Sequence, residues 1–247
     1  MRSQHVAAVI SLGCFILSAG IGLAASYGTR FGWWDYETGL KILSPGIVIA
    51  IAGSVSGAVW IARALNINDS AGWRFGVLGL AGSLVVAFIP LNQLRLYLSS
   101  PPIHDITTDV ADPPSYDVVV KLRGEGPDIN PLTYDAEKLP PLQKAAYPKV
   151  VPLDVSAAPA AAFDAVAAAL PGLGLEVVNA DPNALRVEAV ATTFWFGFKD
   201  DVVVRIRPTA TGSRIDVRSV SRVGVGDSGA NAKRIVRILD AIKARMA

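Results

Sequence analysis

Charge is sparse in the first 98 of the 247 residues, and cysteine and histidine are scarce along the whole chain. The one cysteine, Cys14, lies in an apolar run, so the polar remainder can form neither a disulfide framework nor a cysteine metal site. Only one of the two histidines, His104, lies in that remainder, which leaves a single candidate for histidine base catalysis. These shortages argue against disulfide-stapled folds and triad hydrolases, and we expect neither a metal nor a cofactor.

Three long apolar runs fill the first 98 residues, at about 6–27, 42–62 and 75–95. Each is close to the roughly 20 apolar residues that a helix needs to cross a bilayer, where no water satisfies the backbone. Tryptophans mark the ends of the runs, and Gly53 and Gly57 have the spacing of a close helix contact. The sequence therefore predicts a transmembrane region of three helices over residues 1–98. Lysine and arginine divide evenly between the two sides, so the positive-inside rule does not orient the spans.

The polar remainder has opposite charges in its two halves. Residues 99–185 carry twelve acidic and five basic side chains, whereas residues 186–247 carry six acidic and twelve basic ones. We expect the halves to neutralise each other, so we expect no nucleic-acid partner. Residues 99–152 are also rich in proline, which predicts an extended acidic segment packed on the rest of the domain.

Residues 153–247 show regular periodicity. Ser156 is a candidate N-cap for a first helix that ends at Pro171-Gly172, and a last helix begins near Ala230. Between the helices, short turns separate segments that alternate polar and apolar residues. This order predicts an α+β fold, a two-layer domain with a four-stranded antiparallel sheet and helices on one face. The predicted strands are at about 175–179, 185–192, 201–207 and 214–222.

Arginines outnumber acids on the polar face of the predicted sheet. Guanidinium groups there suit recognition of carboxylate, phosphate or sulfate. The alternative is that acidic residues of 105–137 cover this face with internal ion pairs. The candidate ligand-binding residues, including polar and aromatic neighbours, are Arg205, Arg218, Arg222, Asp201, Asp216, Asp227, Asn231, Trp195, His104 and Asp105.

Three further motifs have simpler interpretations. Gly224–Gly229 fits GxGxxG, but the strand before it alternates charged and apolar residues and too few residues follow for a dinucleotide fold, so we expect Asp227 to cap the last helix. The aromatic run Phe194–Phe198 either packs in the core or forms an exposed tip that contacts lipid or an apolar ligand. Acidic residues after His104 suggest a cation site, or a solvated linker.

Several motifs in a fixed order resemble a known family. They are Pro101–Thr108, Tyr147-Pro148, Trp195–Phe198 with Asp200-Asp201, and Asp216–Gly224 with Asp227–Ala232. Over nearly all of residues 101–245 the chain resembles the bacterial and plastid family called domain of unknown function 1499. The resemblance implies no established activity, and it favours a multi-pass protein of the bacterial inner membrane with a periplasmic domain. The polar residues that correspond, without known roles, are His104, Asp105, Asp201, Arg218, Ser219, Ser221, Arg222, Asp227 and Asn231.

We therefore expect a membrane-anchored, non-catalytic module of the cell envelope. Its expected partners are membrane lipid and an anionic group on a lipid, a glycan or an envelope protein. One alternative is an envelope hydrolase that uses His104 with Asp105 or Asp201. Another is a structural subunit of a membrane complex.

Overall fold

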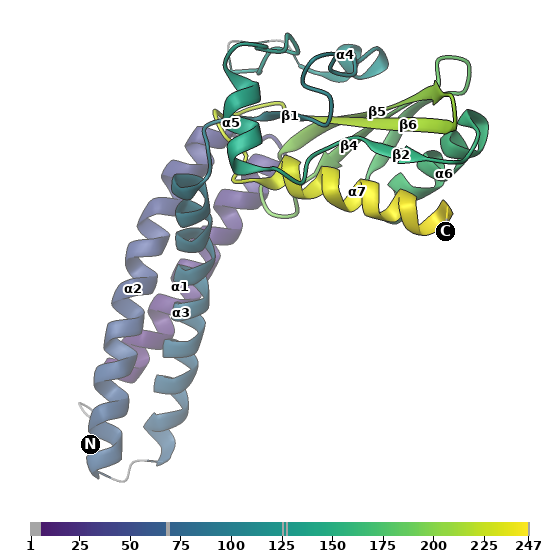
Figure 1. Ribbon diagram of the computed structural model, residues 1–247. Coiled ribbons are helices and arrows are strands. Elements are labelled where there is room, and N and C mark those ends of the chain that lie inside the picture. The colour runs from purple at the N-terminus through teal and green to yellow at the C-terminus, as the bar shows by residue number, and fades with distance from the viewer. Residues whose placement is uncertain (1–5, 68–69, 125, 127, 247) are drawn as a thin grey trace. The chain divides into compact units, whose positions relative to one another are not determined.

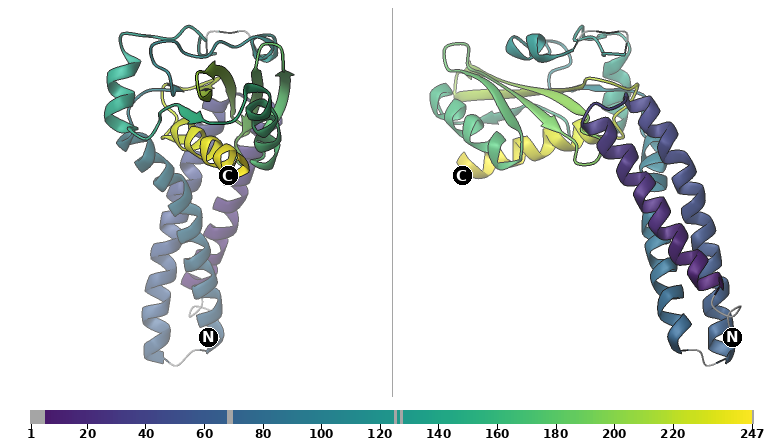
Figure 2. Two further views of the ribbon diagram at one scale, coloured as in Figure 1. Left: turned by 45° about the vertical axis from the view of Figure 1, so that its right-hand side comes forward. Right: turned by 180° about the vertical axis from the view of Figure 1, so that it is seen from behind.

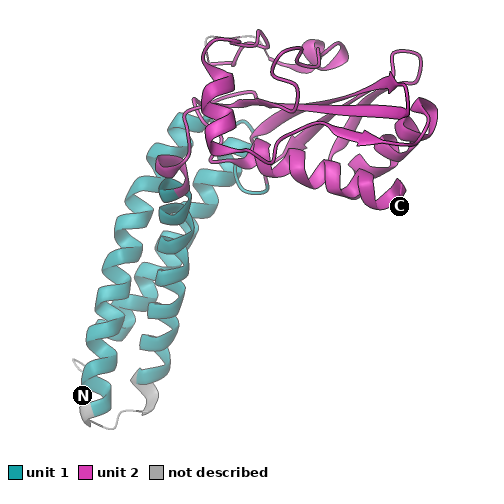
Figure 3. Cartoon of the chain, viewed as in Figure 1, with its two compact units in different colours: residues 1–95, 194–197 teal, residues 96–193, 198–247 magenta. Residues whose placement is uncertain are grey.

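The computed structural model describes residues 6–67, 70–124, 126 and 128–246. The chain forms two compact units, coloured separately in Figure 3. The first unit comprises residues 1–95 and 194–197, and the second comprises 96–193 and 198–247.

Three helices make up most of the first unit, and all are long and apolar enough to cross a membrane, as predicted. They run side by side in both views of Figure 2. Each is longer than its apolar run because helical hydrogen bonds continue into the polar flanks, where hydropathy gives no signal. The helices are α1 (Val6–Arg30), α2 (Tyr36–Ile67) and α3 (Ser70–Ser99).

Glycines allow the three helices to approach closely. A Cβ atom at Gly53 would lie 2.5 Å from the Ser83 hydroxyl, and one at Gly79 would collide with Ser11. The buried Ser11 hydroxyl also donates a 2.8 Å hydrogen bond to the Gly53 carbonyl. Small residues therefore permit both close packing and a polar contact between helices inside the bundle.

The second unit is built on one antiparallel sheet, with strand order β1-β6-β5-β4-β3 and with β2 also paired to β6 (Figure 1). The four predicted strands are present. Two further short strands, one in the proline-rich segment and one directly after it, extend the sheet, and they escaped prediction because three residues are too few to show alternation. The strands are β1 (Asp105–Thr107), β2 (Leu153–Val155), β3 (Glu176–Asp181), β4 (Arg186–Thr192), β5 (Lys199–Thr209) and β6 (Gly212–Ser221).

Two helices, α6 (Pro159–Gly172) and α7 (Ala230–Met246), cover one face of the sheet (Figures 1 and 2). The predicted cap at Ser156 is wrong, because α6 begins later, with Ala158 at the N-cap position and Pro159 at its start. Proline suits this place because its fixed φ is helical and the first helical N–H needs no partner. The core between helices and sheet includes Val166, Leu170, Val204, Ile215, Val217, Ile235, Ile238 and Ile242.

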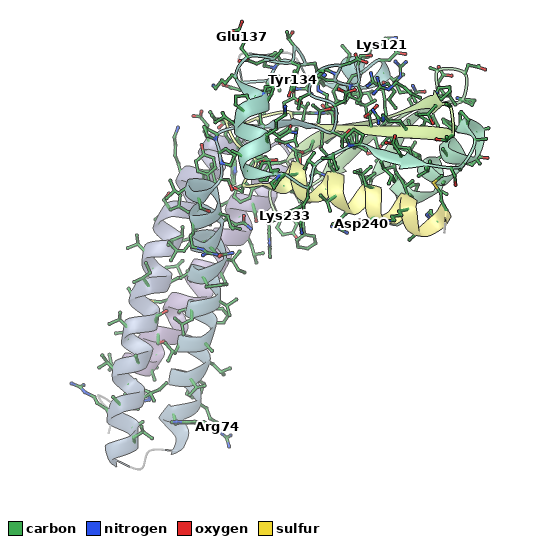
Figure 4. All side chains as sticks on the ribbon, viewed as in Figure 1. Arg74, Lys121, Tyr134, Glu137, Lys233 and Asp240 are labelled. Atoms are coloured by element: carbon green, nitrogen blue, oxygen red, sulfur yellow. The ribbon has the colours of Figure 1, made fainter. Side chains whose placement is uncertain are left out.

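The opposite face of the sheet lies under residues 100–152, called here the covering segment. This segment contains β1 and two short helices, α4 (Val118–Leu122) and α5 (Leu139–Ala146). Figure 4 shows Lys121 and Tyr134 of the covering segment on one side of the sheet, and Lys233 and Asp240 of α7 on the other. The sheet is thus covered on both faces, by apolar helices on one and by an acidic segment on the other.

Candidate functional site

The strands direct most of their charged side chains away from the helices, as predicted, although Asp200 in β5 pairs with Arg234 of α7. In the antiparallel register, Arg205 is opposite Asp216 and Arg207 is opposite Arg214. Their neighbours along each strand, such as Ile215 and Val217, lie in the core instead. We call the charged surface the polar sheet face, and it comprises Arg186, Glu188, Asp201, Arg205, Arg207, Arg214, Asp216, Arg218 and Arg222.

Arg218 occupies a buried position on the polar sheet face. Its Nε and Nη2 atoms donate hydrogen bonds to the two carboxylate oxygens of Asp105, at 2.9 and 2.6 Å. Its Nη1 and Nη2 atoms also donate to the backbone carbonyls of Pro114 (3.2 Å) and Leu132 (2.7 Å). One guanidinium group therefore fastens three separate parts of the covering segment to β6.

Two tyrosine rings flank the same guanidinium. The Arg218 Cζ atom lies 5.3 Å from the ring centre of Tyr116 and 5.5 Å from that of Tyr134. Such contacts with a desolvated cation are favourable. Burial raises the pKa of Tyr134 to about 12 and raises that of Tyr116 well above its ordinary value, so both rings are neutral. Burial also raises the pKa of Asp105, and the hydrogen bond and charge of Arg218 offset only part of this effect.

Asp201 holds a second buried cluster. Its carboxylate accepts hydrogen bonds from Arg222, with Nη2 at 2.7 Å, and from Arg123 of the covering segment. Arg222 donates further to the Leu122 carbonyl at 3.0 Å, and Arg123 donates to the Asn130 carbonyl at 2.5 Å. The three charged side chains are almost completely buried, so this cluster also fixes the covering segment to the sheet.

Partly exposed ion pairs lie towards the other end of the polar sheet face. Arg205 and Arg207 contact Asp109 and Asp112 of the covering segment and the buried Asp216. Burial would raise the pKa of Asp109, but backbone N–H groups and Arg207 outweigh burial and lower it. We call Arg205, Arg207 and Arg214 the arginine rim, and Arg214 pairs with Asp154 in β2 through a 2.8 Å hydrogen bond.

The glycine-rich loop before α7 is a helix cap. The Asp227 carboxylate accepts hydrogen bonds from the backbone N–H groups of Gly229 (2.8 Å) and Asn231 (2.6 Å). Burial raises the pKa of Asp227 despite these bonds. The buried Asn231 side chain donates to the His104 carbonyl at 3.0 Å and to the Ser221 hydroxyl at 2.9 Å. The loop therefore joins α7, β6 and the start of β1.

The His104 ring contacts a backbone carbonyl, and the acids proposed as its catalytic partners bind arginines. Its Nδ1 atom is 3.3 Å from the Val225 carbonyl oxygen, in the loop before α7. The carboxylates of Asp105 and Asp201 are directed at arginines, and Asp109 of the suggested cation site is also bound by arginine. Within the described residues, no group of three or more His, Cys, Asp or Glu side chains is placed to hold a metal ion.

Trp195 lies in the turn between β4 and β5, at residues 193–198. It is 43% exposed and stacks edge-on against Phe194, which is 70% exposed, with ring centres 5.1 Å apart. Of the two interpretations of the aromatic run, the exposed tip fits these two rings. Among the candidate ligand-binding residues, Trp195 is the one with an apolar side chain, and that side chain is exposed.

The sequence did not reveal several participants in these clusters. Arg123, Tyr116 and Tyr134 come from irregular segments without periodicity, and nothing in their spacing points to the sheet. Glu188 was noted only as an acid beside the arginines, yet it is fully buried and accepts the backbone N–H groups of Asp117 (2.6 Å) and Val119 (2.8 Å). The charge imbalance between the two halves of the domain was the only sequence signal that could have pointed to the charged residues among these partners.

A family model described as "Protein of unknown function (DUF1499)" matches residues 105–242, which is more than half of the chain. The chain belongs to this family. No curated protein matches the chain. The DUF1499 match begins at β1 and ends in α7, so it includes both buried arginine clusters and the α7 cap but none of the three candidate spans. The motif residues of this DUF1499 domain therefore contribute largely to internal hydrogen bonds.

Proposed function

We propose that this protein is a membrane-anchored, non-catalytic module whose DUF1499 domain binds an anionic group of a lipid, a glycan or a partner protein. The three candidate spans provide the anchor. The family resemblance supports a bacterial inner membrane with the domain in the periplasm. All three kinds of ligand would present a carboxylate or phosphate group, which paired guanidinium groups can bind.

The arginine rim is the place where such a group can enter. Arg207 and Arg214 are direct neighbours across β5 and β6, and their side chains are 35% and 44% exposed. Their carboxylate partners Asp112 and Asp154 are 67% and 61% exposed, although Arg207 also pairs with Asp109 and the buried Asp216. Exposed ion pairs contribute little to stability, so an incoming anion can exchange with these carboxylates at small cost. This exchangeable pairing is the observation that carries the proposal.

The buried arginines are less suitable. Arg218 and Arg222 are each held by a buried carboxylate and by backbone carbonyls of the covering segment. Removing one partner from a buried pair costs about 3–5 kcal/mol, so a ligand would need to replace every contact of the displaced carboxylate. We therefore move the proposed ligand contacts from Arg218 and Arg222 to Arg205, Arg207 and Arg214. No observation favours the hydrolase alternative, since His104 faces a backbone carbonyl.

The test is native mass spectrometry of the full-length protein extracted in mild detergent. Wild-type protein is compared with an Arg207→Gln/Arg214→Gln variant and with a control, Arg237→Gln, which removes an exposed arginine from α7 on the other face of the sheet. We expect a discrete added mass in the wild type and the control that is lost in the double variant. The added mass itself distinguishes a phospholipid, a saccharide and a polypeptide.

Two results would contradict the proposal. An added mass that survives in the double variant would place the ligand elsewhere. The second is a wild-type protein that carries no added mass and binds neither phosphatidylglycerol nor inorganic phosphate when these are titrated in. The arginine rim would then form internal ion pairs only. A stoichiometric protein partner retained by the wild type and both variants would favour the structural-subunit alternative.

A further inference from the structure

The turn 193–198, which joins β4 to β5, exposes apolar side chains. We call its exposed apolar residues the apolar tip, and they are Phe194 (70% exposed) and Trp195 (43%). Both residues belong to the first unit, together with the candidate spans.

These side chains have the character of an interface anchor. Exposed apolar surface is unfavourable in water by about 25 cal/mol per Å², so removing the two stacked rings from water would be favourable. Tryptophan favours the boundary between lipid and water, where its ring is apolar and its N–H can still find a partner.

The apolar tip belongs to the same unit as the candidate spans. Within this unit, Arg30 at the end of α1 donates a 2.8 Å hydrogen bond to the Phe194 carbonyl. This contact ties the turn that carries the two rings to the end of a candidate span.

We propose that the apolar tip is a membrane-contact site, in which Phe194 and Trp195 insert among the head groups of the bilayer that α1, α2 and α3 cross. The bilayer is the occupant that the hydrogen bond from the end of α1 keeps within reach, whereas a protein partner would have to be recruited. The site lies at the opposite end of β5 and β6 from Arg207 and Arg214, so it does not depend on the anion-binding proposal.

The test measures the position of the Trp195 ring in a bilayer. The full-length protein is labelled with fluorotryptophan and placed in phosphatidylcholine nanodiscs, and the Trp195 fluorine resonance is assigned from its absence in a Trp195→Phe variant. A matched control, Ala210→Trp, adds a tryptophan to the exposed turn between β5 and β6 at the other end of the sheet. Each sample is measured with a lipid that carries a nitroxide near its head group, and separately with a water-soluble gadolinium chelate.

We expect the lipid nitroxide to abolish the Trp195 resonance and to leave the Ala210→Trp resonance unchanged, while the gadolinium chelate does the reverse. Loss of the Trp195 resonance to gadolinium alone would overturn the proposal, because the tip would then lie in water. A Trp195 resonance that neither agent reaches would also overturn it, since protein rather than lipid would cover the ring. Equal loss of both resonances to the lipid nitroxide would show no special role for the apolar tip.

Discussion

Arg218 and Asp105 form a bidentate ion pair, with hydrogen bonds of 2.9 and 2.6 Å, in the buried space between β6 and the covering segment. On an exposed surface such a guanidinium group could bind an external anion, but here it binds an internal carboxylate and holds the covering segment against β6. Its remaining bonds, to the carbonyls of Pro114 and Leu132, join distant turns of the covering segment. The consequences for stability can be measured directly.

We expect Arg218→Ala to destabilise the DUF1499 domain by about 3–5 kcal/mol, because it leaves the buried Asp105 carboxylate without its partner. Removing both charges in Asp105→Leu/Arg218→Met should restore much of the loss. The measurement is the unfolding transition of the domain in detergent-solubilised full-length protein, followed by calorimetry. A single variant as stable as wild type would show that the pair contributes little.

Asp227 should give the domain a stability that increases in mild acid. Burial raises its pKa in the folded state above the unfolded value of 3.8, so the folded protein binds the proton more tightly. The free energy of unfolding should therefore rise, relative to Asp227→Asn, as the pH falls through the folded pKa towards 3.8. Unfolding of both proteins across that pH range tests this. A constant difference between them would contradict it.

Asp109 should show the opposite pH dependence. Burial acts to raise its pKa, but the backbone N–H of Asp112 and the ion pair with Arg207 lower it overall. Its contribution to stability is therefore complete above the unfolded pKa of 3.8 and disappears as the pH falls through the lower folded pKa. Asp109→Asn should be less stable than wild type at neutral pH and should converge with it in acid. Divergence in acid would refute this sign.

The helix bundle should tolerate an added methyl group at one glycine and not at another. A Cβ atom at Gly53 would lie 2.5 Å from the Ser83 hydroxyl and 2.7 Å from the Cys14 Cβ, whereas one at Gly13 meets no atom within 4 Å. Gly53→Ala should therefore lower the thermal stability of the helical unit in detergent, and Gly13→Ala should leave it nearly unchanged. Equal effects of the two substitutions would argue against this packing.

The fold was predictable where the sequence repeats with a period. Alternation identified the strand around Ile215 and Val217, and apolar runs identified the spans, because both patterns depend on burial of one face or of a whole helix. The site was harder to predict. The surplus of arginines was visible, but the pairing of Arg218 with Asp105 depends on tertiary contacts across more than one hundred residues. Tyr116 and Tyr134 lie in irregular backbone, which has no periodic signal.

The pairing of both β1 and β2 with β6 also has a consequence for the order of folding. The β3–β6 meander and the two flanking helices form from contacts between segments close in sequence. In contrast, β1 and β2, at the two ends of residues 105–155, can pair only after β6 is in place. Pairing between distant segments requires closure of a long loop, which is slow relative to hairpin formation. We therefore expect the covering segment to close late, and until then Arg218 of the newly made protein lacks its partner Asp105.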